Sequence, residues 1–146
     1  MASVFIKDKN TFRLDFYLKS LGEYNFRFVN ADEWRKMTDE ERKGFEHCWV
    51  EFKPLTWGLH NQLREKSMFD NPETGMKDWS QSTYMREKMR LVIVDWSFVE
   101  EDEDGNKIKV KVNDESLNSL HPGIAEVIMD TYSEHTELTE DKKKEL

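Results

Sequence analysis

The chain has 146 residues, enough for one domain with its own core, and 36% of them are charged. Its net charge is −8, and the whole excess lies in residues 100–146, where 14 side chains are acidic and 6 are basic. An acidic surface repels nucleic acid and anionic membranes, so neither is an expected partner, and Cys48, the only cysteine, excludes a disulfide framework and a thiolate metal cluster.

The hydrophobic share is low, at 37%, but aromatic residues reach 12% and include five Trp and nine Phe. This combination predicts a small core built from large side chains and argues against disorder. The first residues lack the apolar segment of a signal peptide, and no run is long enough to span a bilayer. We therefore expect the protein in the cytoplasm.

Residues 1–30 predict a three-stranded antiparallel meander. A short strand over residues 4–6 comes first, and a turn follows it. Residues 12–18 then alternate apolar and polar side chains, which is the period of a half-buried strand. Gly22 ends this strand, and residues 24–29 supply the third. The connections are too short for parallel crossovers, so the strands must be antiparallel.

Residues 31–93 are predicted to be helical. Asn30 and Thr38 are candidate capping residues, because each has a glutamate three positions later. The helix that starts at Thr38 is expected to run through Phe45 and Trp49. Another helix should begin after Thr56, residues 68–75 should form a loop, and a last helix should start near residue 78 or 80 and end near residue 93.

Residues 94–112 predict a β-hairpin, because the apolar run 91–98 leads into the acidic turn 100–106 and residues 108–112 alternate. Residues 113–146 predict a helical acidic tail, with a short helix capped by Asn113 or Asp114 and then an amphipathic helix. Its last residues, 139–146, are either a final helical turn or a frayed end. The predicted fold class is α+β, in a single domain over residues 1–146.

The acidic turn invites comparison with a calcium loop. With Gly105 at the sixth position of an EF-hand loop, the twelfth position is Lys111, where calcium needs a bidentate carboxylate. The flanking segments are also predicted strands and not helices. We therefore interpret this stretch as a solvated hairpin tip, with no metal expected.

No catalytic pattern stands out. The four histidines form no metal-binding spacing, and the sequence contains no nucleophile elbow, phosphate-binding loop or dinucleotide fingerprint. His47 beside Cys48 suggests a nucleophile pair, but neighbours on a helix point about 100° apart, so a buried structural cysteine is the better interpretation. The prediction is a protein that is not an enzyme and needs no cofactor.

Two sets of residues are candidates for protein binding. Trp57, Trp79 and Trp96 either form a docking patch, since Trp is enriched at interaction hot spots, or belong to the core. The stripe of the last long helix either borders a groove for a client helix or closes the core of the domain itself. The candidate binding residues are Trp57, Trp96, Ile124, Val127, Ile128 and Tyr132, with Thr131 as the alternative to Tyr132 on the stripe.

From residue 52 onward, the order of features resembles the tail assembly chaperones of long-tailed bacteriophages. Residues 52–58, Phe-Lys-Pro-Leu-Thr-Trp-Gly, are similar to the helix opening of that family. A helix running into residues 94–98, the acidic turn 104–107 and a closing amphipathic helix follow in the order that the family shows. The resemblance covers about two thirds of the chain, and residues 1–50 depart from it.

The resemblance implies a protein without catalytic activity that works in the host cytoplasm. Members of the family bind the long, helical tape measure protein, keep it soluble, help recruit tail tube protein around it, and leave before the virion is complete. Two alternatives stay open: a permanent virion component such as a tail or neck connector, and a small enzyme or inhibitor. An oligomer is compatible with the sequence.

Overall fold

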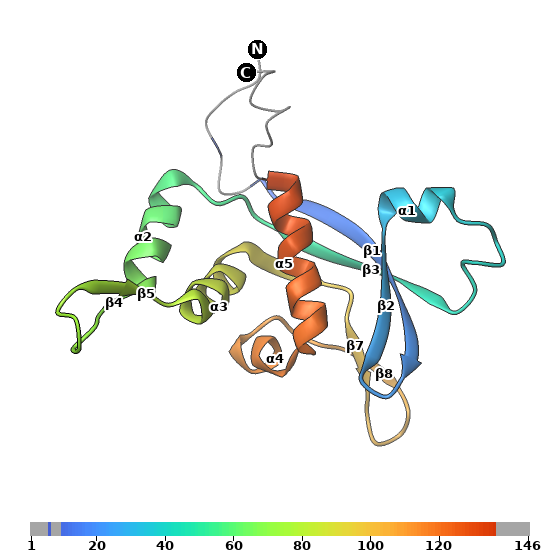
Figure 1. Ribbon diagram of the computed structural model, residues 1–146. Helices are drawn as coiled ribbons and strands as arrows, with labels where there is room; N and C mark the ends of the chain where they lie inside the picture. The colour runs from blue at the N-terminus through green and yellow to red at the C-terminus, as the bar shows by residue number, and fades with distance from the viewer. Residues whose placement is uncertain (1–5, 7–9, 137–146) are drawn as a thin grey trace, which may run out of the picture.

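The computed structural model describes residue 6 and residues 10–136, and it confirms the α+β class. A four-stranded antiparallel sheet has the strand order β2-β1-β3-β6, and two small hairpins pair β4 with β5 and β7 with β8 (Figure 1). The strands are β1 (Phe12–Gly22), β2 (Asn25–Asn30), β3 (Phe45–Phe52), β4 (Met68–Asp70), β5 (Lys77–Trp79), β6 (Ile93–Trp96), β7 (Val99–Glu101) and β8 (Lys107–Lys109). The helices are α1 (Ala31–Lys36), α2 (Trp57–Ser67), α3 (Gln81–Val92), α4 (Asp114–Ser119) and α5 (Pro122–Thr136).

The core lies between one face of the sheet and α5, which crosses that face (Figure 1). Alternate residues of β1 and β3 point toward the helix, because successive strand side chains lie on opposite faces. Fully or nearly buried core residues are Phe16, Cys48, Val50, Phe52, Val92, Ile93, Trp96, Ile128, Met129 and Tyr132. On the opposite face, α1 brings Trp34 onto Tyr17, with ring centroids 3.8 Å apart.

The prediction of a helix through Phe45 and Trp49 is wrong, because this segment belongs to strand β3. The Thr38 cap does form: the Glu41 amide donates to Thr38 Oγ1 at 3.3 Å, and the Thr38 amide donates to Glu41 Oε1 at 3.0 Å. Only a turn follows, and Gly44 adopts a φ of 84°, which a side chain would disfavour. The alternation after Gly44 then suits pairing with β1 along eight residues.

The predicted meander also needs correction. The first predicted strand, residues 4–6, lies outside the described residues except for Ile6, which is not in a strand. Strands β1 and β2 correspond to the other two predicted segments and pair with each other, although β1 continues to Gly22 and β2 to Asn30. The second neighbour of β1 is β3, so the sheet is completed by residues far along the chain.

The hairpin predicted over residues 94–112 is shorter than expected. Strand β6 joins the main sheet beside β3, and only β7 and β8 form the hairpin. The change of direction occurs at Ser97, whose amide donates to Trp49 O at 3.0 Å and whose Oγ accepts from the Trp49 amide at 2.9 Å. Residues 68–75, predicted as a loop, instead contribute β4 and the turn toward β5.

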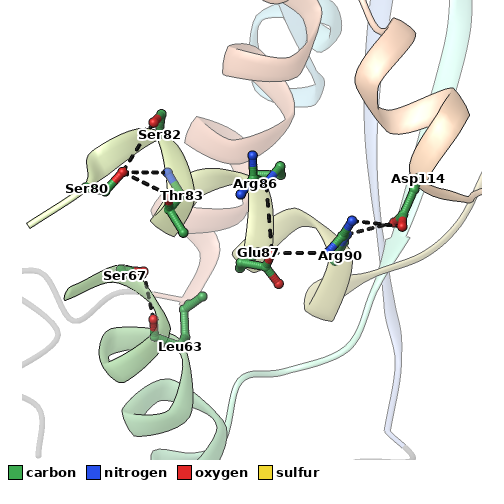
Figure 2. A network of polar contacts seen from close by, with 9 residues as sticks. All are labelled: Leu63, Ser67, Ser80, Ser82, Thr83, Arg86, Glu87, Arg90 and Asp114. Atoms are coloured by element: carbon green, nitrogen blue, oxygen red, sulfur yellow. Dashed lines mark hydrogen bonds and ion pairs between the residues drawn. The ribbon is translucent and has the colours of Figure 1, made fainter. Parts of the chain in front are cut away.

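Residues 57–92 form a lobe beside the sheet, made of α2, the β4–β5 hairpin and α3 (Figure 1). Helix α2 packs on α3, and few of their side chains are fully buried. Ser67 links the parts of the lobe. Its Oγ donates to Leu63 O at 2.7 Å (Figure 2). Its carbonyl accepts from the Ser80 amide at 2.8 Å. We call residues 57–92 the lobe, and the four-stranded sheet with the β7–β8 hairpin, α1, α4 and α5 the body.

Candidate protein-interaction groove

The first wall of the candidate site is the start of α2. Pro54 and Leu55 lead out of β3, and Thr56 caps the helix, with its Oγ1 accepting from the Leu59 amide at 3.2 Å. Trp57 is therefore the first helical residue, and 74% of its surface is exposed. A fixed helix start with a large aromatic pointing into solvent is an arrangement that a partner can bind.

The other walls come from α3 and α5. Tyr84 and Lys88 lie four residues apart on α3 and so share one face of that helix. Tyr132 comes from α5, and its hydroxyl donates to Lys53 O at 3.4 Å. The Lys88 ammonium lies 5.5 Å from the ring centroids of both tyrosines, which is within the range of cation–π attraction.

Between these walls lies a groove of about 650 Å³, open to solvent beside Trp57. Its lining is mainly apolar and aromatic, and the described lining residues include no Asp or Glu. They are Ile6, Pro54, Leu55, Thr56, Trp57, His60, Tyr84, Lys88, Tyr132 and Thr136. This lining fits binding of an apolar or aromatic group.

Burial raises the pKa of Tyr132 to about 12. The phenol therefore stays neutral at physiological pH and keeps its proton for hydrogen bonding. In the groove, Lys88 is only 8% exposed although it carries an ammonium group. The Lys88 ammonium therefore gives the mainly apolar groove a charged group beside its aromatic rings.

The structure places the six predicted binding residues in different surroundings. Trp57 and Tyr132 come together at the groove. Trp96, Ile128 and Tyr132 are at most 2% exposed, and Ile124 and Val127 are half-buried. The stripe of α5 therefore closes the core of the domain itself, which is the second of the two interpretations that the sequence allows. Met129, which the predicted stripe omits, is also in the core.

Neither Tyr84 nor Lys88 is among the binding residues predicted from the sequence. Their spacing of four residues was the available signal, because such residues share a helix face. The spacing does not identify the residue on the facing wall of the groove. Tyr132 is 48 residues farther along the chain, and only the packing of α3 against the body brings it beside Lys88.

The lobe also exposes large apolar side chains away from the groove. Met68, Phe69 and Trp79 on the β4–β5 hairpin are 40–46% exposed, and Met76 in its turn is 70% exposed. The Trp79 ring lies 5.0 Å from that of Tyr84, so the hairpin surface adjoins the face of α3 that borders the groove. Methionine adapts its shape to varied partners, which suits a surface for apolar segments.

His47 and Cys48 do not form a nucleophile pair. They are neighbours on strand β3 and so point to opposite faces, and His47 Nε2 lies 2.7 Å from Asp15 Oδ1. Cys48 is buried, and the loss of solvent raises the pKa of its thiol to about 11. A thiol that stays protonated at physiological pH is a poor nucleophile, so Cys48 acts as a core residue.

The acidic turn is stabilised by its own side chain. Asp102 Oδ1 accepts hydrogen bonds from the Asp104 amide at 3.0 Å and the Asn106 amide at 2.8 Å. Gly105 completes the turn with a φ of 79°. Within the part of the chain that the structure describes, no three His, Cys, Asp or Glu side chains are placed to hold one metal ion.

Searches of protein families, curated proteins and solved structures found no match to this chain. Among the described helices, none combines the length and the apolar character that a membrane crossing requires. The groove and the exposed surface of the lobe are therefore the observations on which a function has to rest.

Proposed function

We propose that this protein is a non-catalytic tail assembly chaperone of a long-tailed bacteriophage. In this proposal it binds the tape measure protein in the host cytoplasm and assists assembly of tail tube protein around it. One observation carries the proposal: the segment Pro54–Gly58 resembles the family's helix opening, and this same segment forms a wall of the groove. Trp57, within this segment, is 74% exposed and so is accessible to a partner.

The distribution of apolar surface supports the same function. A protein that keeps an apolar client soluble needs exposed apolar surface of its own, held on a stable scaffold. Here the aromatic core is closed between the sheet and α5, while Trp57, Met76 and the β4–β5 hairpin expose apolar side chains on the lobe. The net charge of −8 would keep the complex from aggregating.

Co-expression with tape measure fragments tests the proposal. We expect a helical fragment of the tape measure protein to become more soluble in the presence of this chain and to co-purify with it. A helical fragment of a protein unrelated to phage tails, expressed in the same way, is the comparison. If no tape measure fragment co-purifies and none gains solubility, the proposed function is wrong.

The main alternative is a permanent component of the virion, such as a tail or neck connector. Mass spectrometry of purified particles separates the two functions. A chaperone should be absent from finished particles or present only in traces, whereas a connector should be present at a fixed copy number. A fixed copy number would favour the connector.

A further inference from the structure

We propose that the open edge of strand β3 beside His47 binds an extended segment of a partner protein, which adds to the main sheet as a further strand and presents a lysine or arginine to Glu46. The inference goes beyond the proposed function, because this site lies on the body and shares no lining residue with the groove beside Trp57. The two proposals rest on different residues, so each can fail without the other.

Strand β3 is only partly paired on one of its two sides. Strand β1 pairs with it along its whole length, whereas β6, on the other side, pairs only with residues 50–52. The chain leaves the line of β6 at Ser97, after two hydrogen bonds with Trp49. In the part of the chain that the structure describes, no strand continues that line beside residues 45–48. An unpaired stretch of strand is a template on which another strand can form.

The backbone groups of His47 face this open side. Trp49 O accepts from the Ser97 amide and the Trp49 amide donates to Ser97 Oγ, so both groups of Trp49 point away from β1. Backbone groups of an antiparallel strand alternate between its two neighbours, and those of His47, two residues earlier, therefore point the same way. Lys53 keeps this alternation, since its amide donates to Val92 O at 2.8 Å on that side. His47 thus offers one donor and one acceptor to a residue of an added strand.

A groove of about 350 Å³ borders the open edge, and we call it the edge groove. Residues 46–48 of β3 and residues 97–99 after β6 contribute to its lining. Phe26 and Val99 are 39% and 51% exposed, so an added strand would cover apolar surface there. Alternate side chains of that strand would face the groove and the others solvent, which predicts an alternating apolar and polar segment. The large apolar lining residues are Leu18, Phe26, Phe98, Val99 and Ile124.

Charge selects the side chain that the partner presents. Glu46 is the one carboxylate residue in the described lining of the edge groove, which holds no lysine or arginine. The Nε2 atom of His47 lies 2.7 Å from Asp15 Oδ1, so this imidazole already has a carboxylate partner. The chain continues from the groove into the acidic residues 100–104. An acidic site in a protein with a net charge of −8 attracts a cationic segment and disfavours a second copy of the chain.

The closing experiment uses the full chain and a synthetic peptide of about six residues, the usual length of a strand. The peptide alternates threonine and valine, with one lysine in place of a valine, and a matched peptide carries glutamate there. Fluorescence anisotropy of the labelled peptide measures binding, and amide hydrogen exchange follows the His47 amide. We expect the lysine peptide to bind at least about tenfold more tightly than the glutamate peptide. It should also slow exchange of the His47 amide by at least about tenfold.

N-methylated peptides test the backbone pairing directly. One version carries methyl groups on the threonine amides, and the other carries them on the amides of the valine and lysine positions. Alternate amides of a strand face opposite sides, so only one version should lose affinity, by at least about tenfold. Equal affinities of the two versions would mean that the peptide does not bind as a strand, and would overturn the inference.

Variants locate the site. His47→Pro removes the amide donor on the open side, where a strand tolerates proline, and should weaken binding by at least about tenfold. His47→Ala is the matched control, because it loses the same side chain and keeps the amide, and it should change the affinity by less than about twofold. Circular dichroism checks that His47→Pro folds. Glu46→Lys, at an exposed residue, tests the site without a backbone change and should reverse the preference between the lysine and glutamate peptides.

The inference is wrong if no peptide binds, if the lysine and glutamate peptides bind equally, or if folded His47→Pro binds as well as His47→Ala. It is also wrong if the His47 amide is already protected in the chain alone. Protection that depends on protein concentration would assign the edge to a second copy. Protection that disappears when residues 137–146 are deleted would assign it to the chain's own end.

Discussion

The body and the lobe of this protein use apolar side chains in opposite ways. In the body, Phe16, Phe52, Trp96 and Tyr132 are buried between the sheet and α5. In the lobe, the fully buried side chains between α2 and α3 include Leu63 and the polar Ser67, while large apolar residues point outward. From this difference we expect the body to supply most of the stability, and under the proposed function the lobe would supply the contact surface.

Exposed apolar residues also occur on the body, but in smaller groups. Leu21, Tyr24 and Phe26 lie at the β1–β2 turn, and Val99 and Ile108 lie on the β7–β8 hairpin. A hydrogen bond from His121 holds the β1–β2 turn in place. His121 Nδ1 accepts from the Gly123 amide at 3.1 Å, so Nε2 carries the proton and donates to Tyr24 O at 2.8 Å. A groove of about 350 Å³ includes Phe26 and Val99, so the lobe differs in bordering a larger groove, of about 650 Å³, beside Trp57.

The largest predicted effect is on the body. Trp96→Ala should lower the free energy of unfolding by about 3–5 kcal/mol, because it leaves a cavity and removes the hydrogen bond from Trp96 Nε1 to Val110 O at 2.7 Å. Denaturant titration measures this. Trp57→Ala is the matched control on the lobe, and it should change stability by less than about 0.5 kcal/mol. Equal losses would mean that the lobe is as tightly packed as the body.

The second effect separates the lobe from the body. Leu63 is a fully buried residue of α2, so Leu63→Ala should cost about 2–4 kcal/mol, mainly by opening the lobe. Amide hydrogen exchange should then rise in α2 and α3 and stay low in β1 and β3. Val50→Ala, a core change in β3, should raise exchange throughout. If Leu63→Ala also raises exchange in β1 and β3, the two parts unfold as one unit.

The same contrast explains how much could be predicted from the sequence. Predictions from local signals are confirmed where local interactions determine the structure. Thr56 and Asn113 cap helices, and the chain changes from helix to strand at residue 93, within the apolar run. The segment Phe45–Phe52 was misassigned because the Thr38 cap is a strong local signal. Its pairing with β1, about 30 residues away, is a tertiary effect that outweighs the local one.

The groove was predictable only in part, for the same reason. Trp57 could be identified because a tryptophan at a capped helix start is a local feature. Lys88 could not, because a lysine on a predicted helix is ordinarily solvated. It becomes a groove residue through the tyrosine of α5, and no periodicity in the sequence specifies that contact.

The third prediction concerns alkaline pH and the body side of the groove. The pKa of Tyr132 is raised from 10.0 to about 12, mainly because burial disfavours the phenolate. The unfolded chain therefore loses this proton first, and the stabilisation present below pH 10 is lost as pH rises toward 12. The free energy of unfolding, measured by chemical denaturation at a series of pH values, should decline less steeply in Tyr132→Phe than in the wild type over this range.

Cys48 should contribute a separate decline at lower pH. Burial raises the pKa of its thiol from 9.0 to about 11, so its contribution is lost between those values. Cys48→Ala should flatten the profile between pH 9 and 11 and leave the range above 11 unchanged. Tyr24→Phe, at an exposed tyrosine, is the control and should leave the whole profile as it is. An identical decline in all variants would assign the alkaline loss to other groups.

The smallest predicted effect lies at the junction of lobe and body. Arg90 of α3 donates to Asp114 of α4 through Nε at 2.7 Å and Nη2 at 2.8 Å, and to Glu87 through Nη1 at 3.1 Å (Figure 2). The hydrogen bond and charge of Asp114 raise the pKa of Arg90, so the pair stays ionised. Arg90→Lys keeps the charge and loses the two-pronged contact, so the unfolding midpoint should fall by about 1–3 °C.

High salt should reduce that difference, because an exposed ion pair is screened at 1 M salt. Arg86→Lys is the matched control: Arg86 contacts Glu87 at 3.8 Å and does not reach α4, so its midpoint should not move. A fall after Arg90→Lys as large as that after Leu63→Ala would mean that the junction, and not the packing of α2 on α3, holds the lobe in place. The groove would then depend on Asp114 as well, because its walls lie on both sides of that junction.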